Sequence, residues 1–412
     1  MGDVDRRDVR MRGFRERVEV AVALAWVDAH SRALPAEAIA IDFAGGRVLA
    51  ADMVAPIDVP AFDRAAMDGY AMRADETVGA SDYNPLAFAV VGEALPARPF
   101  TGGVRTGAAV RVMTGAPMPA ELDAVVPAEY AQLADGRVEI TAACTPGKHV
   151  SRRGEDLRTG QTVLAAGRHL RPQDAGLLAS LGFARVQVVR RPRVRLVVTG
   201  NEVVPPGRPK GEWEVFDANS AMLRALVVRD GGAIEGFFRP GDDAARIADA
   251  MAAPGADVVL VSGGSSVGAE DHAPRLLAQA GELAVHGVAM RPSSPAGMGR
   301  IDDRLVFLLP GNPVSCLCAY DFFAGRAIRR LGGLSAEWPY RAVEAPVARK
   351  IVSAIGRVDY CRVRLGGSGV EPLALSGASM LSTTTRADGF VIVPGESEGF
   401  GPGARVTVHL YG

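Results

Sequence analysis

The chain has 412 residues, which exceeds one ordinary core and predicts roughly three or four domains. Its net charge is -1, from 46 basic and 47 acidic residues, so its overall charge favours neither a nucleic-acid nor a membrane partner. The first apolar stretch, 18–27, is too short to cross a bilayer and lacks the layout of a signal peptide. Because the four cysteines show no disulfide spacing, we expect a cytoplasmic protein.

The first half of the chain combines two predicted helices with many short strands. Apolar periodicity predicts a helix over 14–30, and the Pro-rich stretch 50–70 reads as extended. Short β-forming runs alternate with Gly and Pro turns over 86–140. A helix is expected at 171–182 and a strand at 186–190. This half is therefore predicted to be rich in β-structure.

From about residue 191, predicted strands alternate with predicted helices. The strands are expected at 195–198, 258–261 and 305–309, and the helices at 220–229, 242–253, 273–280 and 314–330. This alternation predicts a mostly parallel sheet with helices on both faces. After Trp338 the helical patterns stop, and short β runs over 343–410 predict a small β-barrel.

Three loops at predicted strand ends are candidates for ligand binding: 198–202, 262–271 and 310–315. Ligands of open α/β sheets bind beyond the carboxyl ends of the strands. The second loop places glycines and serines between a strand and a helix, where small residues let backbone N–H groups approach an anion. It predicts a phosphate or similar oxyanion site. The alternative is a tight turn in which glycine serves backbone geometry alone.

Three carboxylates, Glu202, Asp242 and Asp271, lie in or near these loops. Asp242 and Asp271 stand at predicted helix starts, where helix capping is the competing explanation. Glu202 has no capping explanation. A carboxylate beside a phosphate loop commonly holds the metal that offsets phosphate charge. We therefore expect these three residues to bind Mg²⁺. The ionic segment 62–71 is either a charged surface turn or a substrate-facing loop.

Six motifs of the chain occur together in the order of one known family. They are PAFDRAAMDGYAMR (60–73), MTGAPMP (113–119), RRGED (152–156), VTGNE (198–202), the 262–271 loop and PGNPVS (310–315). The chain resembles the molybdopterin molybdenumtransferases of the MoeA type, a family that includes the gephyrin E domain. The resemblance extends over about 14–412.

This resemblance implies a multidomain α/β plus β fold and an elongated homodimer. The expected domains are an elongated helical-β N-terminal domain (12–50 and 145–190), an inserted β-rich domain (51–144), a three-layer α/β/α molybdopterin-binding domain (191–333) and a C-terminal β-barrel (334–412).

The activity that the resemblance implies is Mg²⁺-dependent insertion of molybdate into adenylylated molybdopterin, with release of AMP. The expected partners are the enzyme that produces adenylyl-molybdopterin and the apo-molybdoenzymes that receive the cofactor. Two alternatives stay open. One is a non-catalytic carrier or scaffold that binds molybdopterin or the finished cofactor, and the other is a tungstate-specific variant.

The resemblance also assigns site residues. The residues expected to be catalytic are Asp68, Thr114, Glu202, Asp242 and Asp271, with Asp68 and Thr114 supplied by the partner subunit. The residues expected to bind the pterin are Thr199, Gly200, Ser262, Gly263, Gly264, Ser266, Gly268, Arg291, Ser294, Pro310, Gly311, Asn312 and Ser379, with Ser376 as an alternative to Ser379.

One segment departs from the family pattern. Gly287, Arg291 and Ser294 stand where the family usually has lysines, and Ala269 replaces a glutamate. Arg291 keeps the positive charge and adds a bidentate fork. The departure is either lineage variation, with hydroxyl donors serving the anion, or an altered substrate such as tungstate.

Overall fold

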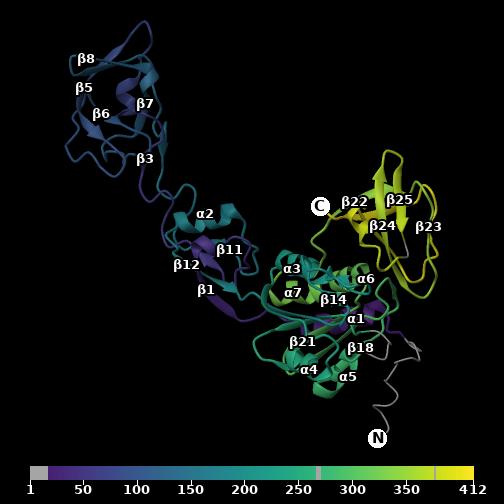
Figure 1. Cartoon of the computed structure of the whole chain (residues 1–412). Coiled ribbons are helices and arrows are strands. Elements are labelled where there is room, and N and C mark those ends of the chain that lie inside the picture. The colour runs from purple at the N-terminus through teal and green to yellow at the C-terminus, as the bar shows by residue number, and fades with distance from the viewer. Residues whose placement is uncertain (1–16, 266–270, 375–376) are drawn as a thin grey trace. The chain divides into compact units, whose positions relative to one another are not determined.

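The computed structural model describes residues 17–265, 271–374 and 377–412. The chain divides into two compact units, drawn in Figure 1. Unit 1 comprises Met1–Ile39, Gly46–Ala50 and Gln187–Gly412, and unit 2 comprises Ala40–Gly45 and Ala51–Val186. The four domain ranges expected from the sequence stay a prediction. No helix in the described part of the chain is long and apolar enough to span a membrane.

Unit 1 is built on a six-stranded mixed sheet with the strand order β16-β13-β17-β21-β20-β18. Its strands are β13 (Arg193–Val198), β16 (Ala233–Phe238), β17 (Val258–Ser262), β18 (Glu282–His286), β20 (Gly297–Ile301) and β21 (Arg304–Leu309). The first four strands of this order run parallel, while β20 and β18 pair antiparallel. The Val- and Leu-rich central strands are buried on both faces, as a helix-covered parallel sheet requires.

Helices cover both faces of this sheet. On one face pack α1 (Val20–His30), α3 (Asn219–Arg229), α6 (Pro313–Ala319) and α7 (Gly325–Leu331), and on the other α4 (Ala244–Ala252) and α5 (Ala273–Ala280). The helix predicted at 314–330 is confirmed, with a π-helical turn at Tyr320–Ala324 between α6 and α7. The helix predicted over 14–30 begins only at Val20 among the described residues, so the prediction was wrong over 17–19, and 14–16 lie outside the described residues.

The start of α4 corrects the capping interpretation of Asp242. The N-cap is Asp243, whose carboxylate accepts hydrogen bonds from the backbone N–H groups of Ala245 and Arg246. Asp242 therefore precedes the helix. Likewise, α5 has His272 at its N-cap position, so Asp271 precedes that helix too. Capping therefore does not explain Asp242, and Asp271 stands before the N-cap position of α5.

The C-terminal strands form a curled, half-barrel sheet. Its strands are β19 (Met290–Arg291), β22 (Arg341–Pro346), β24 (Val358–Gly366), β25 (Gly369–Ala374), β26 (Gly389–Val393) and β28 (Arg405–Leu410), with β23 (Ile351–Val352) and β27 (Gly399–Phe400) paired beside them. The expected β-barrel stays a prediction. The expectation of no further helix was wrong, because α8 (Leu381–Thr385) follows β25. This one-turn, Thr-rich helix is too short to show apolar periodicity.

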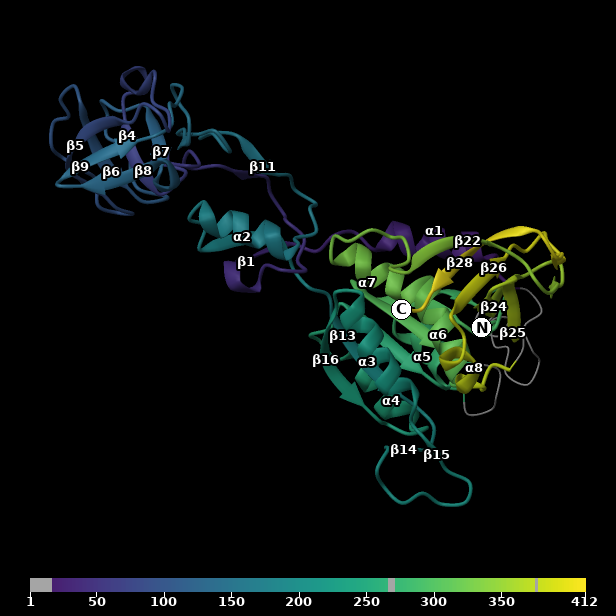
Figure 2. The same cartoon turned by 90° about the horizontal axis from the view of Figure 1, so that it is seen from above.

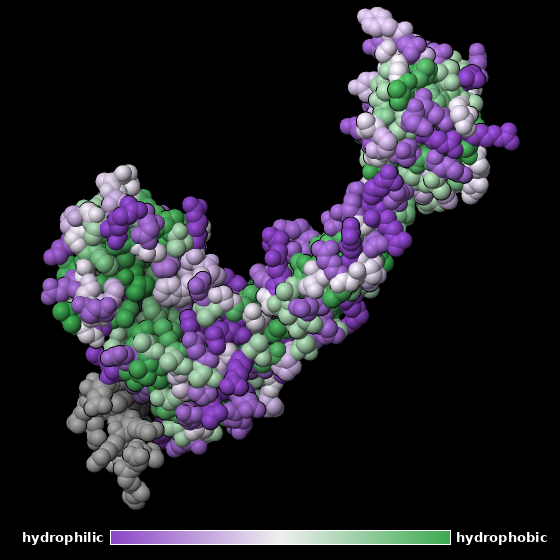
Figure 3. Space-filling view, turned by 180° about the vertical axis from the view of Figure 1, so that it is seen from behind, coloured by the Kyte–Doolittle hydropathy of each residue, from purple (hydrophilic) through white to green (hydrophobic). Residues whose placement is uncertain are grey.

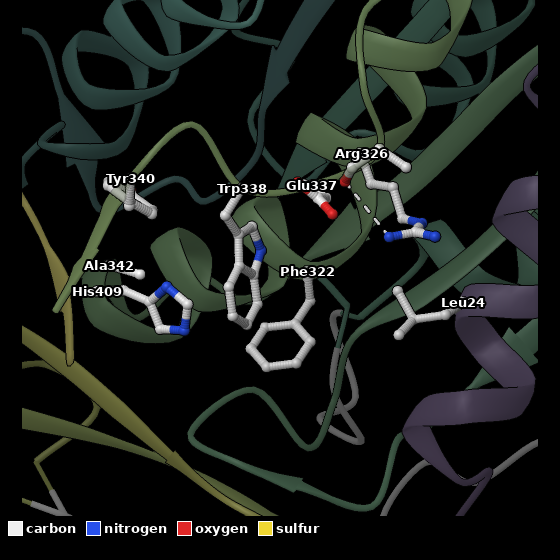
Figure 4. A pocket seen from close by; sticks show the side chains of 9 residues that line it. Leu24, Phe322, Arg326, Glu337, Trp338, Tyr340, Ala342 and His409 are labelled. Atoms are coloured by element: carbon white, nitrogen blue, oxygen red, sulfur yellow. Dashed lines mark hydrogen bonds between the residues drawn. The ribbon is translucent and has the colours of Figure 1, made fainter. Parts of the chain in front are cut away.

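Aromatic side chains join the half-barrel to the helices of the α/β sheet. The ring of Trp338 packs edge-on against Phe322, Phe390 and His409, with centroids 4.9–5.4 Å apart. Figure 4 shows Phe322, Trp338 and His409 beside a groove of about 430 Å³ that Leu24 and Arg326 also line. Apolar side chains gather over a hollow on the face of unit 1 seen in Figure 3. The half-barrel and the α/β sheet thus share one core.

A buried ionic network stabilises the same junction. The Asp321 carboxylate is fully buried and accepts hydrogen bonds from Arg229 at 3.0 Å and from the hydroxyl of Tyr340. Arg229 and Arg329 both pair with buried Asp230. Burial raises the pKa of Asp321, and the neighbouring Arg229 opposes that rise. Removing one partner would leave a buried charge uncompensated.

Unit 2 contains a second six-stranded sheet, with the order β7-β4-β6-β5-β9-β8. Its strands are β4 (Gly69–Met72), β5 (Leu86–Ala94), β6 (Ala108–Val112), β7 (Ala124–Pro127), β8 (Ala131–Ala134) and β9 (Arg137–Ile140). The predicted helix at 171–182 is confirmed as α2 (Pro172–Ser180), where Asp174 and Arg171 form a capping box. Short pairs join β2 (Met53–Val54) to β11 (Thr162–Leu164) and β3 (Arg64–Ala65) to β10 (Val150–Ser151).

The chain passes between the two units through β1 (Ala36–Ala40) and β12 (Arg185–Val189). Single 3-10 turns occur at Ile41–Phe43, Ala74–Thr77 and Ala128–Tyr130.

Asp321→Ala is expected to lower the free energy of unfolding by about 3 kcal/mol, because Arg229 would lose one of its two buried carboxylate partners and would share the other, Asp230, with Arg329. Chemical denaturation followed by tryptophan fluorescence measures this, since the Trp338 indole donates to the Asp321 carbonyl. The control is Glu282→Ala, whose carboxylate is 47% exposed in its pair with Arg300, so the loss should stay below about 1 kcal/mol. Equal losses for the two variants would contradict the argument.

Candidate functional site

The three predicted strand-end loops of unit 1 meet in one cavity of about 780 Å³. It lies at the carboxyl ends of β13, β17 and β21, where open α/β sheets bind ligands. The residues assigned from the sequence that line it are Thr199, Gly200, Glu202, Asp242, Ser262, Gly263, Gly264, Asp271, Pro310, Gly311, Asn312 and Ser379. The fold thus gathers all three expected metal carboxylates and most of the expected pterin-binding residues.

Gly263 shows why the floor of the cavity needs glycine. Its φ of +95° is a left-handed conformation, and an added Cβ would lie 2.7 Å from Thr199 Oγ1 and 3.0 Å from the Thr199 carbonyl oxygen. The Gly263 N–H donates to the carbonyl of Leu309, and the Thr199 N–H donates to that of Ser262, each at 3.0 Å. These bonds bring the ends of β13, β17 and β21 too close together for any side chain at 263.

Unsatisfied polar atoms face this region. Thr199 Oγ1, Ser265 Oγ and Asn219 Oδ1 are buried without a hydrogen-bond partner in the part of the chain that the structure describes. Leaving a buried polar group unpaired costs about 1–3 kcal/mol. All three residues line the cavity. A polar ligand would satisfy these groups.

Two residues of the site escaped the sequence analysis. The Asn219 amide donates to Ser262 Oγ at 2.9 Å and to the Gly311 carbonyl at 2.8 Å, so it ties the second loop to the third. Asp217 is buried, accepts a hydrogen bond from the Ser220 N–H at 2.9 Å and forms an ion pair with Arg239. The available signal was an Asp-x-Asn sequence at the start of a helix. It was not enough, because Asn219 contacts residues that are distant in the sequence.

A reciprocal pair of hydrogen bonds positions Asp242. Its carboxylate accepts from the Asn201 N–H at 2.9 Å, and its own N–H donates to Asn201 Oδ1 at 3.2 Å. The neighbouring Glu202 lies across Gly200, since a Cβ there would meet Glu202 Oε2 at 2.7 Å. Asn201 therefore holds the two acidic loops against each other. Asp271 reaches the same cavity from the start of α5.

The carboxylates do not form a preformed metal cage. Within the described residues, no three His, Cys, Asp or Glu side chains are close enough together to hold an ion. Mg²⁺, however, is commonly bound by one or two carboxylates, with waters and substrate phosphates completing its shell. The donor set of Glu202, Asp242 and Asp271 fits Mg²⁺ in that incomplete form, with ligand oxygens supplying the rest.

Asp68 and Thr114 form a local pair in unit 2, whereas the cavity lies in unit 1. They flank the antiparallel strands β4 and β6, where Gly69 pairs with Val112. The Asp68 carboxylate accepts from the Thr114 N–H and from Thr114 Oγ1, both at 2.7 Å. These bonds, the backbone bond first, hold the pKa of Asp68 below its ordinary value, so Asp68 is an anion at neutral pH.

The ionic segment around Asp63 also has structural partners. Its carboxylate accepts from Arg152 Nη1 at 2.6 Å and from the Arg153 N–H at 2.8 Å. Arg153 Nε in turn donates to Asp58. Part of the charge in segment 62–71 therefore binds that loop to the 152–156 motif.

Arg291 and Ser294 lie in a second cavity of about 780 Å³, which Arg17, Arg357 and Ser315 also line. It shares Pro295, Pro310 and Asn312 with the first cavity. Arg291 forms an ion pair with Asp359, so part of its charge is already compensated. Among the described residues, Ser294 Oγ is buried without a hydrogen-bond partner.

Some assigned residues cannot be placed. Ser266 and Gly268 of the second loop, the neighbouring Ala269, and Ser376 lie outside the described residues. Of the two C-terminal serines considered, Ser379 lines the first cavity.

Fold and cavity together define an α/β protein with a cavity lined by polar groups at the carboxyl edge of its sheet. Comparison with protein families identifies three regions of the chain. Residues 18–182 match the MoeA N-terminal region (domain I and II), 195–330 match a probable molybdopterin binding domain, and 344–411 match the MoeA C-terminal region (domain IV).

Whole-chain relatives agree. The molybdopterin molybdenumtransferase 2 of Mycobacterium tuberculosis is 38% identical over 78% of this chain and 81% of its own length. The molybdopterin molybdenumtransferase of Haemophilus influenzae is 31% identical over 90% and 93%. The crystal structure of a molybdopterin biosynthesis MoeA protein from Pyrococcus horikoshii OT3 superposes with a TM-score of 0.79 at 29% identity, covering 96% of this chain and 100% of that one.

The chain belongs to the MoeA family of molybdopterin molybdenumtransferases, enzymes of molybdenum cofactor biosynthesis. This confirms the resemblance that the six motifs indicated.

Gly263→Ala is expected to weaken molybdopterin binding by at least about 10-fold, because the new Cβ would push Thr199 into the cavity. Calorimetric titration with molybdopterin measures this. The control is Gly182→Ala, at φ +85° with nothing within 4 Å of the added Cβ. It carries the same left-handed strain, about 1–2 kcal/mol, without the collision. If both variants bind like the unaltered protein, Gly263 does not shape the site.

Proposed function

We propose that the protein inserts molybdate into adenylylated molybdopterin with the help of Mg²⁺ and releases AMP. The observation that carries the proposal is the convergence of Glu202, Asp242 and Asp271 on the cavity that the unsatisfied Thr199 and Ser265 hydroxyls also face. Acidic and hydroxyl groups around a glycine floor suit a ligand that carries phosphates together with a metal ion.

Catalysis of phosphate release is mainly a matter of positioning and charge. Breaking the phosphoanhydride yields AMP and a molybdopterin phosphate, with the added oxygen coming from water or molybdate. Thr199, Ser262 and Ser265 would donate to the phosphate oxygens, and Asn219 would fix Ser262 in place. Mg²⁺, held by one or two of the carboxylates Glu202, Asp242 and Asp271 together with substrate phosphates, would neutralise phosphate charge. Ser266 and Gly268, which lie outside the described residues, stay predicted binding residues of the same loop.

The adjoining cavity is proposed to hold the metal oxyanion. Arg291 and Ser294 would donate to molybdate there, close to the first cavity across Pro295, Pro310 and Asn312. Arginine and hydroxyl donors can replace a lysine toward an oxyanion, although with different geometry. Turnover with tungstate and not with molybdate would instead favour the tungstate-specific variant.

A homodimer is proposed to complete the site, with Asp68 and Thr114 of one subunit meeting the carboxylates of the other. The ionised Asp68, fixed by Thr114, is suited to orient a donor or a cation. The enzyme that makes adenylyl-molybdopterin and the apo-molybdoenzymes are the proposed partners, and the cytoplasm is the proposed location.

A non-catalytic carrier or scaffold for molybdopterin is the second candidate. The observation that favours it is the compensation of Arg291 by Asp359, which leaves less free positive charge for an oxyanion. Tight binding of the finished cofactor without AMP release would favour the carrier.

Pure protein incubated with adenylylated molybdopterin, Mg²⁺ and molybdate is expected to release AMP and to yield a cofactor that activates an apo-molybdoenzyme. Asp242→Asn should lower the rate of AMP release by at least about 100-fold, since it removes a charge proposed to face Mg²⁺. Asp243→Asn is the matched control. It removes the same charge one residue away and keeps a good helix cap, so it should retain its activity. Equal rates for both variants, or no AMP release by the unaltered protein, would refute the proposal.

Mixed dimers test whether the site is shared between subunits. Asp68→Asn and Asp242→Asn are each expected to be inactive as homodimers. A purified dimer with one subunit of each kind contains one site in which both residues are intact, so about half of the normal activity should return. If both residues serve the same subunit's site, the mixed dimer stays inactive. Chromatography on two different affinity tags isolates the mixed dimer for the AMP-release assay.

A further inference from the structure

The loop between β14 (Val203–Val204) and β15 (Val215–Phe216) carries one exposed aromatic residue, Trp213, and Phe216 at the end of β15 lines the first cavity. The Trp213 side chain is 84% exposed and that of Phe216 46% exposed. Figure 2 shows this loop standing away from the rest of unit 1. A large aromatic surface left in water forgoes the stabilisation that burial gives, so Trp213 contributes little to folding.

Both ends of this loop are fixed at the cavity. The Val215 N–H donates to the Glu202 carbonyl and the Asp217 N–H donates to the Val204 carbonyl, each at 2.9 Å. Asp217 is itself buried and held by Ser220 and Arg239. Trp213 lies only two residues before the anchored Val215. Two residues span at most about 7 Å, so the indole stays near the cavity wall, and a turn of the loop about its anchored ends can bring the ring over the cavity.

The anchored strands supply an apolar wall to the cavity. Val203, Val215 and Phe216 line it, together with a set of hydroxyl and carboxylate groups. The unsatisfied Thr199 and Ser265 hydroxyls in the same cavity point independently to a ligand. Polar groups suit the phosphate part of a ligand, whereas an aromatic face suits a flat heterocycle, which stacks on it without base-specific hydrogen bonds.

We propose that Trp213 and Phe216 clamp a flat nitrogen heterocycle of the bound substrate, and that the 205–214 loop folds toward the cavity when the ligand binds. The inference rests on the proposed function, which supplies two such rings, the pterin and the adenine. Trp213 acts as a positioning residue, because it orients the substrate without touching the reacting atoms.

Tryptophan fluorescence measures whether Trp213 becomes buried when a ligand binds. The chain has three tryptophans, and Trp26 and Trp338 are half-buried, so the exposed Trp213 dominates quenching by acrylamide. The difference between the unaltered protein and Trp213→Phe isolates its signal. Titration with AMP in one arm and with molybdopterin in the other is expected to shift the Trp213 emission to shorter wavelength and to reduce its quenching. The arm that responds identifies the ring that is clamped.

Steady-state kinetics then distinguishes a role of Trp213 in positioning the substrate from a role in stabilising the fold. Trp213→Ala should raise the KM for adenylylated molybdopterin about 10-fold, the typical effect of losing one stacking face, with a much smaller change in kcat. Trp213→Phe should restore most of the affinity, because it keeps an aromatic face. Tyr83→Ala removes an equally exposed aromatic ring from unit 2 and should change neither constant.

The outcomes distinguish this inference from the proposed function. If the unaltered protein turns over its substrate, but neither ligand changes Trp213 emission and Trp213→Ala keeps its KM, the clamp is refuted and the proposed function stands. If the unaltered protein neither binds nor turns over adenylylated molybdopterin, the proposed function fails and the clamp fails with it.

Discussion

Two backbone hydrogen bonds at the carboxyl edge of the sheet hold the candidate site together. One joins Thr199 to Ser262 and the other joins Gly263 to Leu309. They continue the parallel ladders of β13, β17 and β21 one residue beyond the strands and bring three loops into contact. The sheet must be buried on both faces to keep these ends in register, and the helices on each side provide that burial. The cavity is thus a consequence of how the strands end.

The central strands and most helices were predictable, because their signals are local. The Val- and Leu-rich runs of β13, β17 and β21 can be recognised from the pattern of apolar residues and from the length of each run. In contrast, β20 contains two glycines in five residues, a composition that argues against a strand. It forms because Gly299 lets the backbone of Glu282 approach closely, where a Cβ would lie 1.8 Å from the carbonyl oxygen. That contact is invisible before the partner strand is known.

The site was partly predictable for a related reason. Glycine and serine after a strand have a physical meaning that the sequence alone carries, and the family resemblance placed the carboxylates. The sequence could not tell which of two adjacent aspartates caps α4, because either would satisfy the free N–H groups. In the structure, Asp243 caps the helix, while the Asp242 carboxylate accepts a hydrogen bond from the Asn201 N–H. Asn219 was missed because it acts on two loops more than forty residues away in sequence.

The aromatic junction between the half-barrel and the α/β sheet has a consequence for how the chain can evolve. Trp338 and Tyr360 pack against Phe322, which belongs to the helices of the α/β sheet, so the half-barrel and the α/β sheet each leave apolar surface uncovered without the other. Loss of the last eighty or so residues would therefore expose the aromatic residues of the remaining fold to water. Truncation or domain exchange at this boundary would require compensating substitutions on both sides of the junction. We therefore expect the half-barrel and the α/β sheet to be inherited together.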